Sequence, residues 1–152
     1  VLNPSFEAGE GDTFTSWMKA GVGENYPGNL IEQDLTDYSD GQRAAKITKG
    51  MESSPGLYQY VPVTVGASYE VSFWGHSSAV GGIRLRVMGH IGDTVATDLV
   101  SSTTFGLGDS VWRRYARTFT VPPNYTHAKI IISSVINQGI VWIDNVRLRR
   151  IA

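Results

Sequence analysis

Two acidic residues near opposite ends of the chain are the side chains best suited to hold a metal ion. Glu7 lies in the N-terminal segment NPSFE, and Asp144 lies in the C-terminal segment WIDNV. A hard cation such as calcium is bound by carboxylate and main-chain carbonyl oxygens. The two acids could share an ion if the first and last strands lie side by side, with the turn 40–43 adding carbonyl oxygens. The alternative is that both acids only accept main-chain hydrogen bonds in turns.

An aromatic ring that points away from the core is the second feature with chemical potential. In the segment YEVSFWGH, residues 69–76, alternation places Val71 and Phe73 toward a core and Trp74 on the opposite face. A flat ring packs against the C–H face of a sugar, while a few polar groups bind its hydroxyls. Trp74 is therefore the first candidate platform. The alternative is that Trp74 packs on a sheet face beneath a loop.

Further aromatic residues are assigned by the same alternation. Tyr58 and Tyr60 point away from the apolar positions of their segment and are the second candidates for a platform. Tyr26 and Tyr38 lie in predicted loops and are candidates for a rim around a ligand. Trp112 and Trp142 stand at strand ends, where we expect them to close the core.

Two arginines suggest an acidic ligand. In IRLRVMGH, residues 83–90, Arg84 and Arg86 point away from the core, as Trp74 does on the preceding strand. Arginine binds carboxylate and sulfate oxygens through a bidentate fork. A tryptophan beside these arginines would suit a polysaccharide with uronate or sulfate groups. Alternatively both arginines are solvated or pair with Glu70 across the sheet, and a neutral β-glucan, xylan or mannan remains a possible ligand.

No catalytic cluster is evident. The chain lacks the motifs G-x-S-x-G and H-E-x-x-H, and its three histidines fall on different predicted strands. Without cysteine, thiol catalysis and disulfides are excluded. A lyase with Tyr60 as base beside the two arginines is the one enzymatic alternative. The pattern favours a protein that binds a ligand and does not transform it.

Length and charge narrow the class of partner. The 152 residues suit one domain, predicted to span residues 1–152, and 13 basic against 14 acidic residues give a net charge of −1. This balance predicts no general electrostatic surface for nucleic acid or membranes. The longest apolar run also falls short of the roughly 20 residues of a membrane span.

Short segments with period-two alternation or many β-branched residues, separated by glycines, predict an all-β sandwich or barrel. The expected strands are Leu30–Gln33, Ala44–Thr48, Leu57–Val65, Ser68–His76, Ile83–Ile91, Val95–Val100, Trp112–Val121, His127–Val135 and Ile140–Arg149. No segment has the apolar stripe of a helix longer than one turn.

The ordered set of motifs resembles carbohydrate-binding modules of the family 4/9/16/22 type. The matching pieces are NPSFE before Trp17, YSDG at 38–41, L-x-Q-x-V-x-V at 57–63, G-x-x-Y-x-VSFW at 66–74, TFTVP at 118–122 and IDNV at 143–146. The resemblance covers nearly the whole chain. It implies an all-β fold, a β-sandwich jelly roll of two antiparallel sheets, with Trp17 in its core. It also implies a structural calcium ion held by Glu7, Asp144 and the carbonyl of Gln42.

The resemblance further implies non-catalytic binding of a polysaccharide or oligosaccharide. We expect an extracellular, secreted module of a larger multidomain chain, which targets an attached enzyme or particle to its substrate. We expect no nucleic acid and no membrane as partners. The alternative function is a structural or adhesion domain of a phage tail or cell-surface assembly, in which the same aromatic residues would anchor interfaces.

Overall fold

Ten β-strands and no helix form the computed structural model, which describes all 152 residues. The strands are β1 (Met18–Ala20), β2 (Leu30–Asp34), β3 (Ala44–Thr48), β4 (Gly56–Pro62), β5 (Ser68–Ser77), β6 (Val80–Ile91), β7 (Thr94–Leu107), β8 (Arg113–Thr120), β9 (His127–Ser134) and β10 (Ile140–Arg150). No helix is present that is long and apolar enough to cross a membrane.

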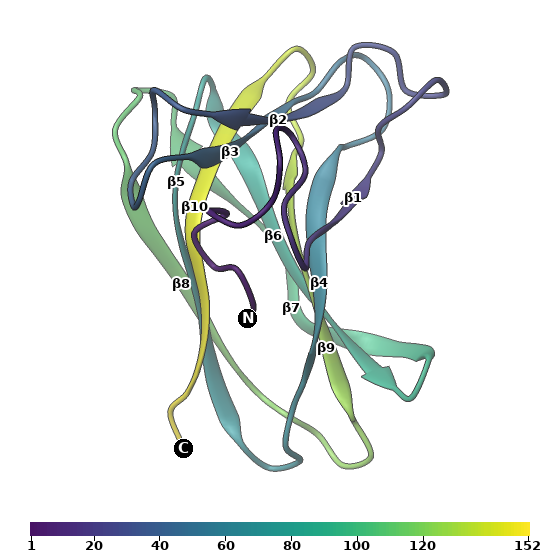
Figure 1. Ribbon diagram of the computed structural model, residues 1–152. Helices are drawn as coiled ribbons and strands as arrows, with labels where there is room; N and C mark the ends of the chain where they lie inside the picture. Colours follow the sequence, from purple (N-terminus) through teal and green to yellow (C-terminus); the bar gives the residue numbers. More distant parts are fainter.

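The strands form two five-stranded antiparallel sheets that pack face to face (Figure 1). The first sheet has the order β1-β4-β9-β6-β7, and the second has the order β2-β3-β10-β5-β8. The predicted β-sandwich of two antiparallel sheets is therefore confirmed. Nine of the ten strands were expected from the sequence. The short β1 was missed because three exposed residues carry no alternation signal.

The core lies between the inner faces of the two sheets. Phe73 on β5 and Ile143 on β10 face Leu85 on β6 and Ile132 on β9, and all four are fully buried. The sheets approach closely at Gly75, where a Cβ would lie 2.9 Å from the Cδ1 atom of Ile83. Burial of alternate residues on each strand leaves one outer face per sheet for other uses.

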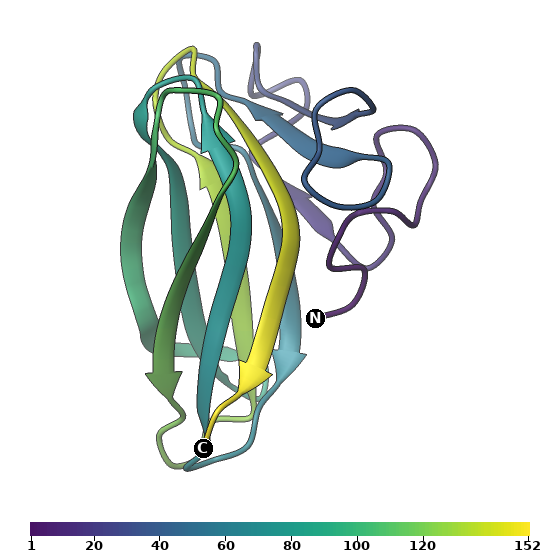
Figure 2. The same cartoon turned by 90° about the vertical axis from the view of Figure 1, so that its left-hand side faces the viewer.

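The N-terminal segment wraps around one edge of the sandwich without regular structure (Figure 2). Phe6, Phe14 and Trp17 are buried in it, and the Phe6 ring lies 5.2 Å from the Trp17 ring, centre to centre. The Trp17 indole donates to the carbonyl of Asn3 at 2.9 Å. The prediction that Trp17 packs in the core is confirmed.

Arg43 connects this irregular segment to the second sheet. Its side chain is buried, and its guanidinium donates to the carbonyls of Phe6, Ala8, Gly11 and Thr13 and to the side chain of Gln33. Its charged plane also lies 4.8 Å from the centre of the Phe14 ring. Buried carbonyls without a partner are costly. Arg43 donates to four carbonyls, one of them on the buried Phe6, in a segment that has no ladder to do so.

Replacement of Arg43 by lysine should destabilise the domain strongly. Lysine keeps the positive charge but offers three donors on a point charge in place of five in a planar fork. The carbonyls of Phe6, Gly11 and Thr13 would then lose a donor, at a total cost of about 2–4 kcal/mol in the free energy of unfolding. Urea denaturation measures this loss. Arg149→Lys, at an exposed position, is the control and should change stability by less than about 0.5 kcal/mol. Equal stability of the two variants would contradict this role of Arg43.

Candidate functional site

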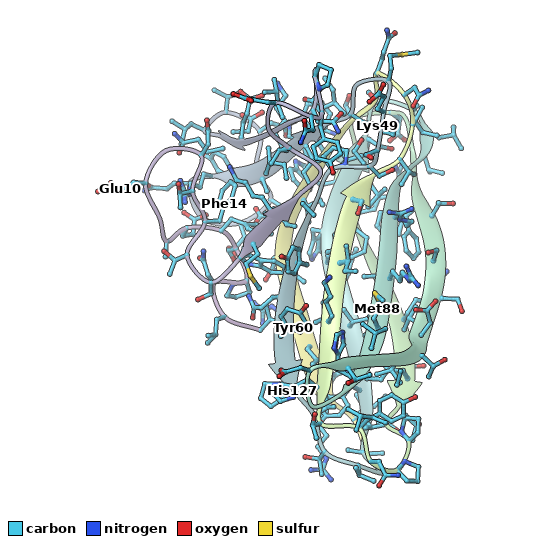
Figure 3. All side chains as sticks on the ribbon, turned by 90° about the vertical axis from the view of Figure 1, so that its right-hand side faces the viewer. Glu10, Phe14, Lys49, Tyr60, Met88 and His127 are labelled. Carbon is cyan, nitrogen blue, oxygen red and sulfur yellow. The ribbon has the colours of Figure 1, made fainter.

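The outer face of the first sheet carries two tyrosines and a set of long polar side chains. Tyr58 and Tyr60 on β4 are cross-strand neighbours of Ile131 and Lys129 on β9. On the other side of β9, the same two residues pair with Arg86 and Met88 of β6. We call this face the tyrosine surface, formed by Tyr58, Tyr60, Arg84, Arg86, Met88 and Lys129. Figure 3 shows Tyr60 and Met88 on it.

The two tyrosine rings form a corner on this surface. Their centres lie 6.0 Å apart at right angles, and the side chain of Tyr60 is 43% exposed. The Lys129 ammonium lies 4.3 Å from the centre of the Tyr58 ring and 5.6 Å from that of Tyr60. These cation–π contacts hold the ammonium on the sheet, where its remaining N–H groups face solvent. The surface thus combines ring faces with positioned donors.

The charges of the tyrosine surface are partly neutralised. The Arg86 Nε atom lies 3.0 Å from a carboxylate oxygen of Asp98 on β7. Arg84 lies two residues before Arg86 on β6, is half-buried and makes no ion pair. The alternative in which these arginines pair with Glu70 is wrong, because Glu70 lies on the other sheet.

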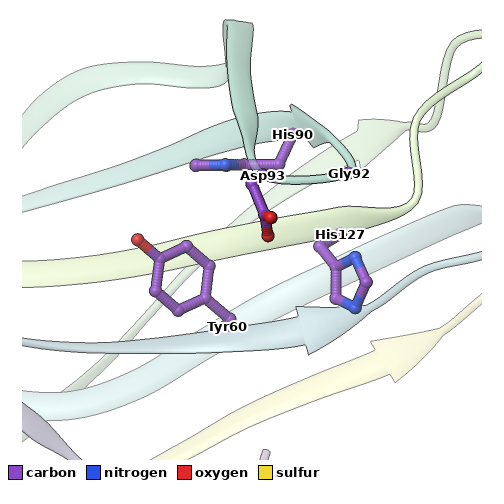
Figure 4. Close-up of a pocket in the computed structure, with 5 residues that line it drawn as sticks. All are labelled: Tyr60, His90, Gly92, Asp93 and His127. Atoms are coloured by element: carbon purple, nitrogen blue, oxygen red, sulfur yellow. The ribbon is translucent and has the colours of Figure 1, made fainter.

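A hollow of about 440 Å³ lies at one end of the tyrosine surface (Figure 4). It is lined by Tyr60, His90, Gly92, Asp93 and His127. The hairpin that joins β6 to β7 bends away from the sandwich here and forms a wall (Figure 1). A chain lying along the surface would meet this wall at the hollow.

His90 is the buried polar residue of the hollow. Its side chain is only 4% exposed, its Nε2 atom has no hydrogen-bond partner, and the Tyr60 ring packs edge-on at 5.2 Å. Burial, together with the nearby charges of Lys129 and His127, lowers the pKa of His90. The neutral imidazole is therefore the favoured form of His90 at neutral pH.

Trp74 lies on the outer face of the second sheet, away from the tyrosine surface. On β5 it is a cross-strand neighbour of Arg114 on β8 and of Asp144 on β10. The expectation that Trp74 shares a surface with Arg84 and Arg86 is wrong, because β5 and β6 belong to different sheets. Figure 2 shows β8, β5 and β10 side by side on the second sheet.

A cluster of rings occupies one end of the same outer face. The His76 ring stacks on Trp142 at 4.3 Å and meets Trp112 edge-on at 4.8 Å, centre to centre. One carboxylate oxygen of Asp37 lies 2.8 Å from His76 Nε2, and the other accepts from the Trp112 indole. Neither tryptophan belongs to the core, so the prediction that Trp112 and Trp142 close it is wrong. Strand ends do not show from sequence which side a ring will take.

Asp34 fixes the other side of this cluster. Its carboxylate accepts the Trp142 indole N–H at 2.9 Å and further hydrogen bonds from Thr36 and the main chain of Asp37. Burial alone would raise the pKa of Asp34, but these donors outweigh it and hold the pKa at about 2. The loop 35–43 is thereby fastened to the outer face of the second sheet.

The two predicted rim tyrosines do not lie together. Tyr38 belongs to the loop 35–43, and its side chain is 42% exposed. Neighbouring main-chain groups of this loop, at Ser39 and Asp40, bind the carboxylate of Asp144 beside Trp74. Tyr26 lies half-buried in the connection between β1 and β2.

The predicted metal ligands gather around one turn. The Glu7 carboxylate accepts hydrogen bonds from the main chain of Gln42 and Arg43, at 3.0–3.2 Å. Asp144 is fully buried, and its carboxylate accepts the N–H groups of Ser39, Asp40 and Asn145. Both acids therefore accept main-chain hydrogen bonds, as in the alternative to a metal site. No three side chains of the His, Cys, Asp or Glu type lie close enough together to hold a metal ion.

The electrostatics of the turn nevertheless suit a cation. Burial, with a smaller contribution from the nearby charge of Asp40, raises the pKa of Asp144 to about 6 against the effect of its three N–H donors. No basic side chain offsets this buried carboxylate. Gly41, at φ +71°, lies so close to Glu7 that a Cβ there would fall 2.2 Å from a carboxylate oxygen. The donor types fit calcium, with main-chain carbonyls supplying the remaining ligands.

A comparison of the sequence with protein families identifies its class. The model of the carbohydrate-binding domain family, which covers modules of the 4 and 9 type, matches residues 1–136. The chain belongs to this family. Strand β10, with Asp144, lies beyond the matched residues of the domain. No curated protein sequence matches.

Solved structures share the fold of the domain. A xylan-binding CBM22-1 domain from Paenibacillus barcinonensis is 15% identical, with a TM-score of 0.69 and coverage of 96% of this chain and 90% of that one. TmCBM61, solved with β-1,4-galactotriose, is 18% identical, with a TM-score of 0.65 and coverage of 99% and 97%. Tailspike protein 4 of bacteriophage CBA120 is 17% identical at a TM-score of 0.74. The match covers 99% of this chain but only 21% of the tailspike chain.

Several residues of the domain's outer faces were not among the predicted site residues. They are Met88, Asp93 and Lys129 at the first sheet and Arg114, Arg147 and Arg149 at the second. Alternation in His127–Ile132 already puts Lys129 on the polar side of β9, so a signal existed for it. Asp93 lies in a hairpin whose direction no sequence pattern predicts.

Acid should release the hydrogen bonds that fasten the loop 35–43 to the domain. Because the pKa of Asp34 falls from 3.8 to about 2 on folding, its stabilising contribution is complete above about pH 4 and is lost as the pH falls toward 2. Asp34 is half-exposed, so solvent screening limits the contribution to about 1 kcal/mol. Asp34→Asn should therefore destabilise at pH 7 and much less at pH 2.5, as measured by urea denaturation.

Glu52→Gln, at an exposed loop position, is the matched control for Asp34. It should leave the free energy of unfolding at pH 7 nearly unchanged. A loss for Asp34→Asn that is the same at both pH values would contradict the ionic origin of the effect.

Proposed function

We propose that this carbohydrate-binding domain binds a β-linked polysaccharide along the tyrosine surface and does not transform it. The observation that carries the proposal is the pair Tyr58 and Tyr60, whose rings stand at right angles on the outer face of a sheet beside Lys129. Two ring faces in different planes suit successive sugars of a twisted chain. The family membership supports a saccharide as the ligand.

Polar groups beside the rings are arranged for hydroxyl recognition. Lys129 and Arg84 supply donors, and Asp98 and Asp93 supply acceptors at the far side of the sheet and in the hollow. This is the usual mixture of apolar platform and a few polar groups in a ligand site. The hollow's volume of about 440 Å³ also lies within the usual range of such sites, about 300–1,000 Å³.

A neutral polysaccharide suits the tyrosine surface better than an acidic one. The Arg86 charge is paired with Asp98, and the hollow adds the carboxylate of Asp93. The similar structures whose names mention xylan or galactotriose support a β-linked ligand of this kind. Binding to a neutral chain should change little with ionic strength, because no charge pairs form.

The biological role that we infer is targeting. A shallow surface buries little area per sugar, so a modest affinity is expected, suited to reversible attachment. Such a module would belong to a larger secreted chain and would concentrate an attached enzyme or particle on an extracellular polysaccharide. It would need neither nucleic acid nor a membrane as partner.

Removal of either tyrosine ring should weaken binding. Tyr60→Ala is expected to reduce the affinity for xylohexaose or a galactotriose-type oligosaccharide roughly tenfold or more, because the platform and its contact with His90 are lost. Isothermal titration calorimetry measures the change. Tyr26→Ala, a tyrosine outside the surface, is the matched control and should bind as the wild type does. Binding by Tyr60→Ala that equals the wild type would rule out the tyrosine surface.

The second candidate is a structural or adhesion domain, and the fold likeness to a bacteriophage tailspike supports it. In that role the exposed rings would be interface anchors. Light scattering separates the two functions. Self-association that Tyr60→Ala abolishes, without retention on any polysaccharide gel, would favour the structural role.

We further propose that a calcium ion binds at the turn 40–43, held by Glu7, Asp144 and the carbonyl of Gln42. The support is the convergence of these residues on one turn and the uncompensated burial of Asp144. The ion would tie the N-terminal segment to β10 and would not contact the ligand.

Chelation should therefore lower thermal stability. An ion at one hundred times its dissociation constant stabilises by about 2.7 kcal/mol, which corresponds to roughly 5–11 °C in Tm for a chain of this size. Calorimetry with EDTA and then with excess calcium measures the loss and its recovery. Asp144→Asn should abolish the response, whereas Asp109→Asn, at a distant exposed acid, should keep it. A wild-type Tm that changes with neither EDTA nor calcium would refute the metal site.

A further inference from the structure

We propose that the outer face of the second sheet is a separate binding site for an anionic saccharide that carries carboxylate or sulfate groups. The site consists of Trp74 as the platform and the guanidinium groups of Arg114, Arg147 and Arg149. We call this set the arginine surface. It lies on the opposite side of the sandwich from the tyrosine surface, so a single sugar chain on one face does not contact the other.

Trp74 differs from the other three tryptophans in its indole N–H. Those of Trp17, Trp112 and Trp142 donate to Asn3, Asp37 and Asp34, respectively. The Trp74 indole has no acceptor within the protein, and it is not among the buried polar atoms that lack a partner. Its N–H is therefore open to solvent. A half-exposed ring with a free donor on a sheet face is equipped to stack on a sugar and bind one of its oxygens.

The register of the second sheet puts arginines around this ring. Arg114 is the direct cross-strand neighbour of Trp74 on β8. On β10, Arg147 and Arg149 pair with Ser72 and Glu70, which point to the same side of β5 as Trp74. All three arginines are exposed. Directly opposed residues lie about 5 Å apart, so these side chains can reach one ligand together.

The charge of this face is positive, although the chain as a whole carries −1. Glu70 is the carboxylate that pairs with these guanidinium groups, whereas Asp144 beside Trp74 is buried beneath the loop 35–43. The Glu70 Oε1 atom lies 2.6 Å from Arg114 Nη2 and 3.6 Å from Arg149 Nη2. Arg147 contacts only the neutral side chain of Asn145, through Nε. The terminal nitrogens of Arg147 and Arg149 keep unused donors, which fit carboxylate or sulfate oxygens in bidentate geometry.

The loop 35–43 bounds the arginine surface on one side. It is held by Asp37 on His76, two residues from Trp74, and by the hydrogen bonds of Ser39 and Asp40 to Asp144. The exposed Tyr38 lies between these fixed points. A ligand on Trp74 would therefore have an ordered rim at one end and arginines at the other.

Titration with two anionic ligands and one neutral ligand tests the site. The probes are a galacturonic acid hexamer, a chondroitin sulfate hexasaccharide and xylohexaose, measured by calorimetry at 20 and 200 mM salt. We expect saturable binding of at least one anionic probe, weakened several-fold by the higher salt. The preferred anionic probe distinguishes carboxylate from sulfate recognition. Xylohexaose binding reports on the tyrosine surface and should be nearly independent of salt.

Variants separate the two faces. Trp74→Ala and Arg147→Ala should each weaken anionic binding roughly tenfold and leave xylohexaose binding unchanged. Tyr60→Ala is the matched control, with the opposite pattern. Arg147→Ala is exposed and should not affect folding, so it keeps the test informative if Trp74→Ala unfolds.

Three results would overturn the inference. The first is no saturable binding of either anionic probe, even if xylohexaose binds. The second is anionic binding that Trp74→Ala and Arg147→Ala leave intact. The third is equally tight binding of a single-stranded oligonucleotide, which would indicate a general polyanion surface. Failure of both xylohexaose and β-1,4-galactotriose to bind would overturn the tyrosine surface and leave the arginine surface standing.

Discussion

Packing of β5 against β6 across the core is the constraint that determines where this domain can bind anything. The two strands follow each other in the chain, but their inner faces pack on each other, closely enough at Gly75 that a methyl group would collide with Ile83. Their outer faces must then point in opposite directions. Every residue that alternates outward on β5 is thereby separated from every outward residue on β6 by the full thickness of the sandwich.

The outer faces of the two sheets differ in what covers them. On the first sheet, Lys129 lies against the tyrosine rings. The β6–β7 hairpin borders this face at one end. The second sheet is covered at one end by the loop 35–43, which Asp34 and Asp37 fasten to Trp142, Trp112 and His76. Partly buried indoles need acceptors, and Asp34 at the end of β2 and Asp37 in the loop supply the carboxylates. Only the part of the face beyond Asp144 stays open.

Local patterns predicted the strands and which side chains face the core, because burial on one face imposes a period of two. Trp74, Tyr58, Tyr60, Arg84 and Arg86 all point outward as expected. The sequence could not tell which sheet each strand joins, since that choice depends on contacts between distant segments. For this reason the prediction placed Trp74 on the same surface as Arg84 and Arg86, although they lie on different sheets.

Long-range polar contacts were the other part hidden from the sequence. Arg43 satisfies carbonyls about 30 residues away in a segment without alternation, and Asp37 holds two rings that follow it by 39 and 75 residues. No local pattern encodes such pairs. The convergence of Glu7 and Asp144 on one turn was expected only because a known family supplied the arrangement.

The opposed faces also limit how the domain can use them. Two sites on one face could grip a single chain more tightly, because the second contact would be intramolecular. Sites on opposite faces cannot share a short chain, so each keeps the modest affinity of a shallow surface. Their chemistry differs as well, since Asp93 and Asp98 offset part of the positive charge at the first face, whereas the three arginines of the second face share the single carboxylate of Glu70. The two proposed sites would therefore suit binding of two different polymers rather than a tighter hold on one.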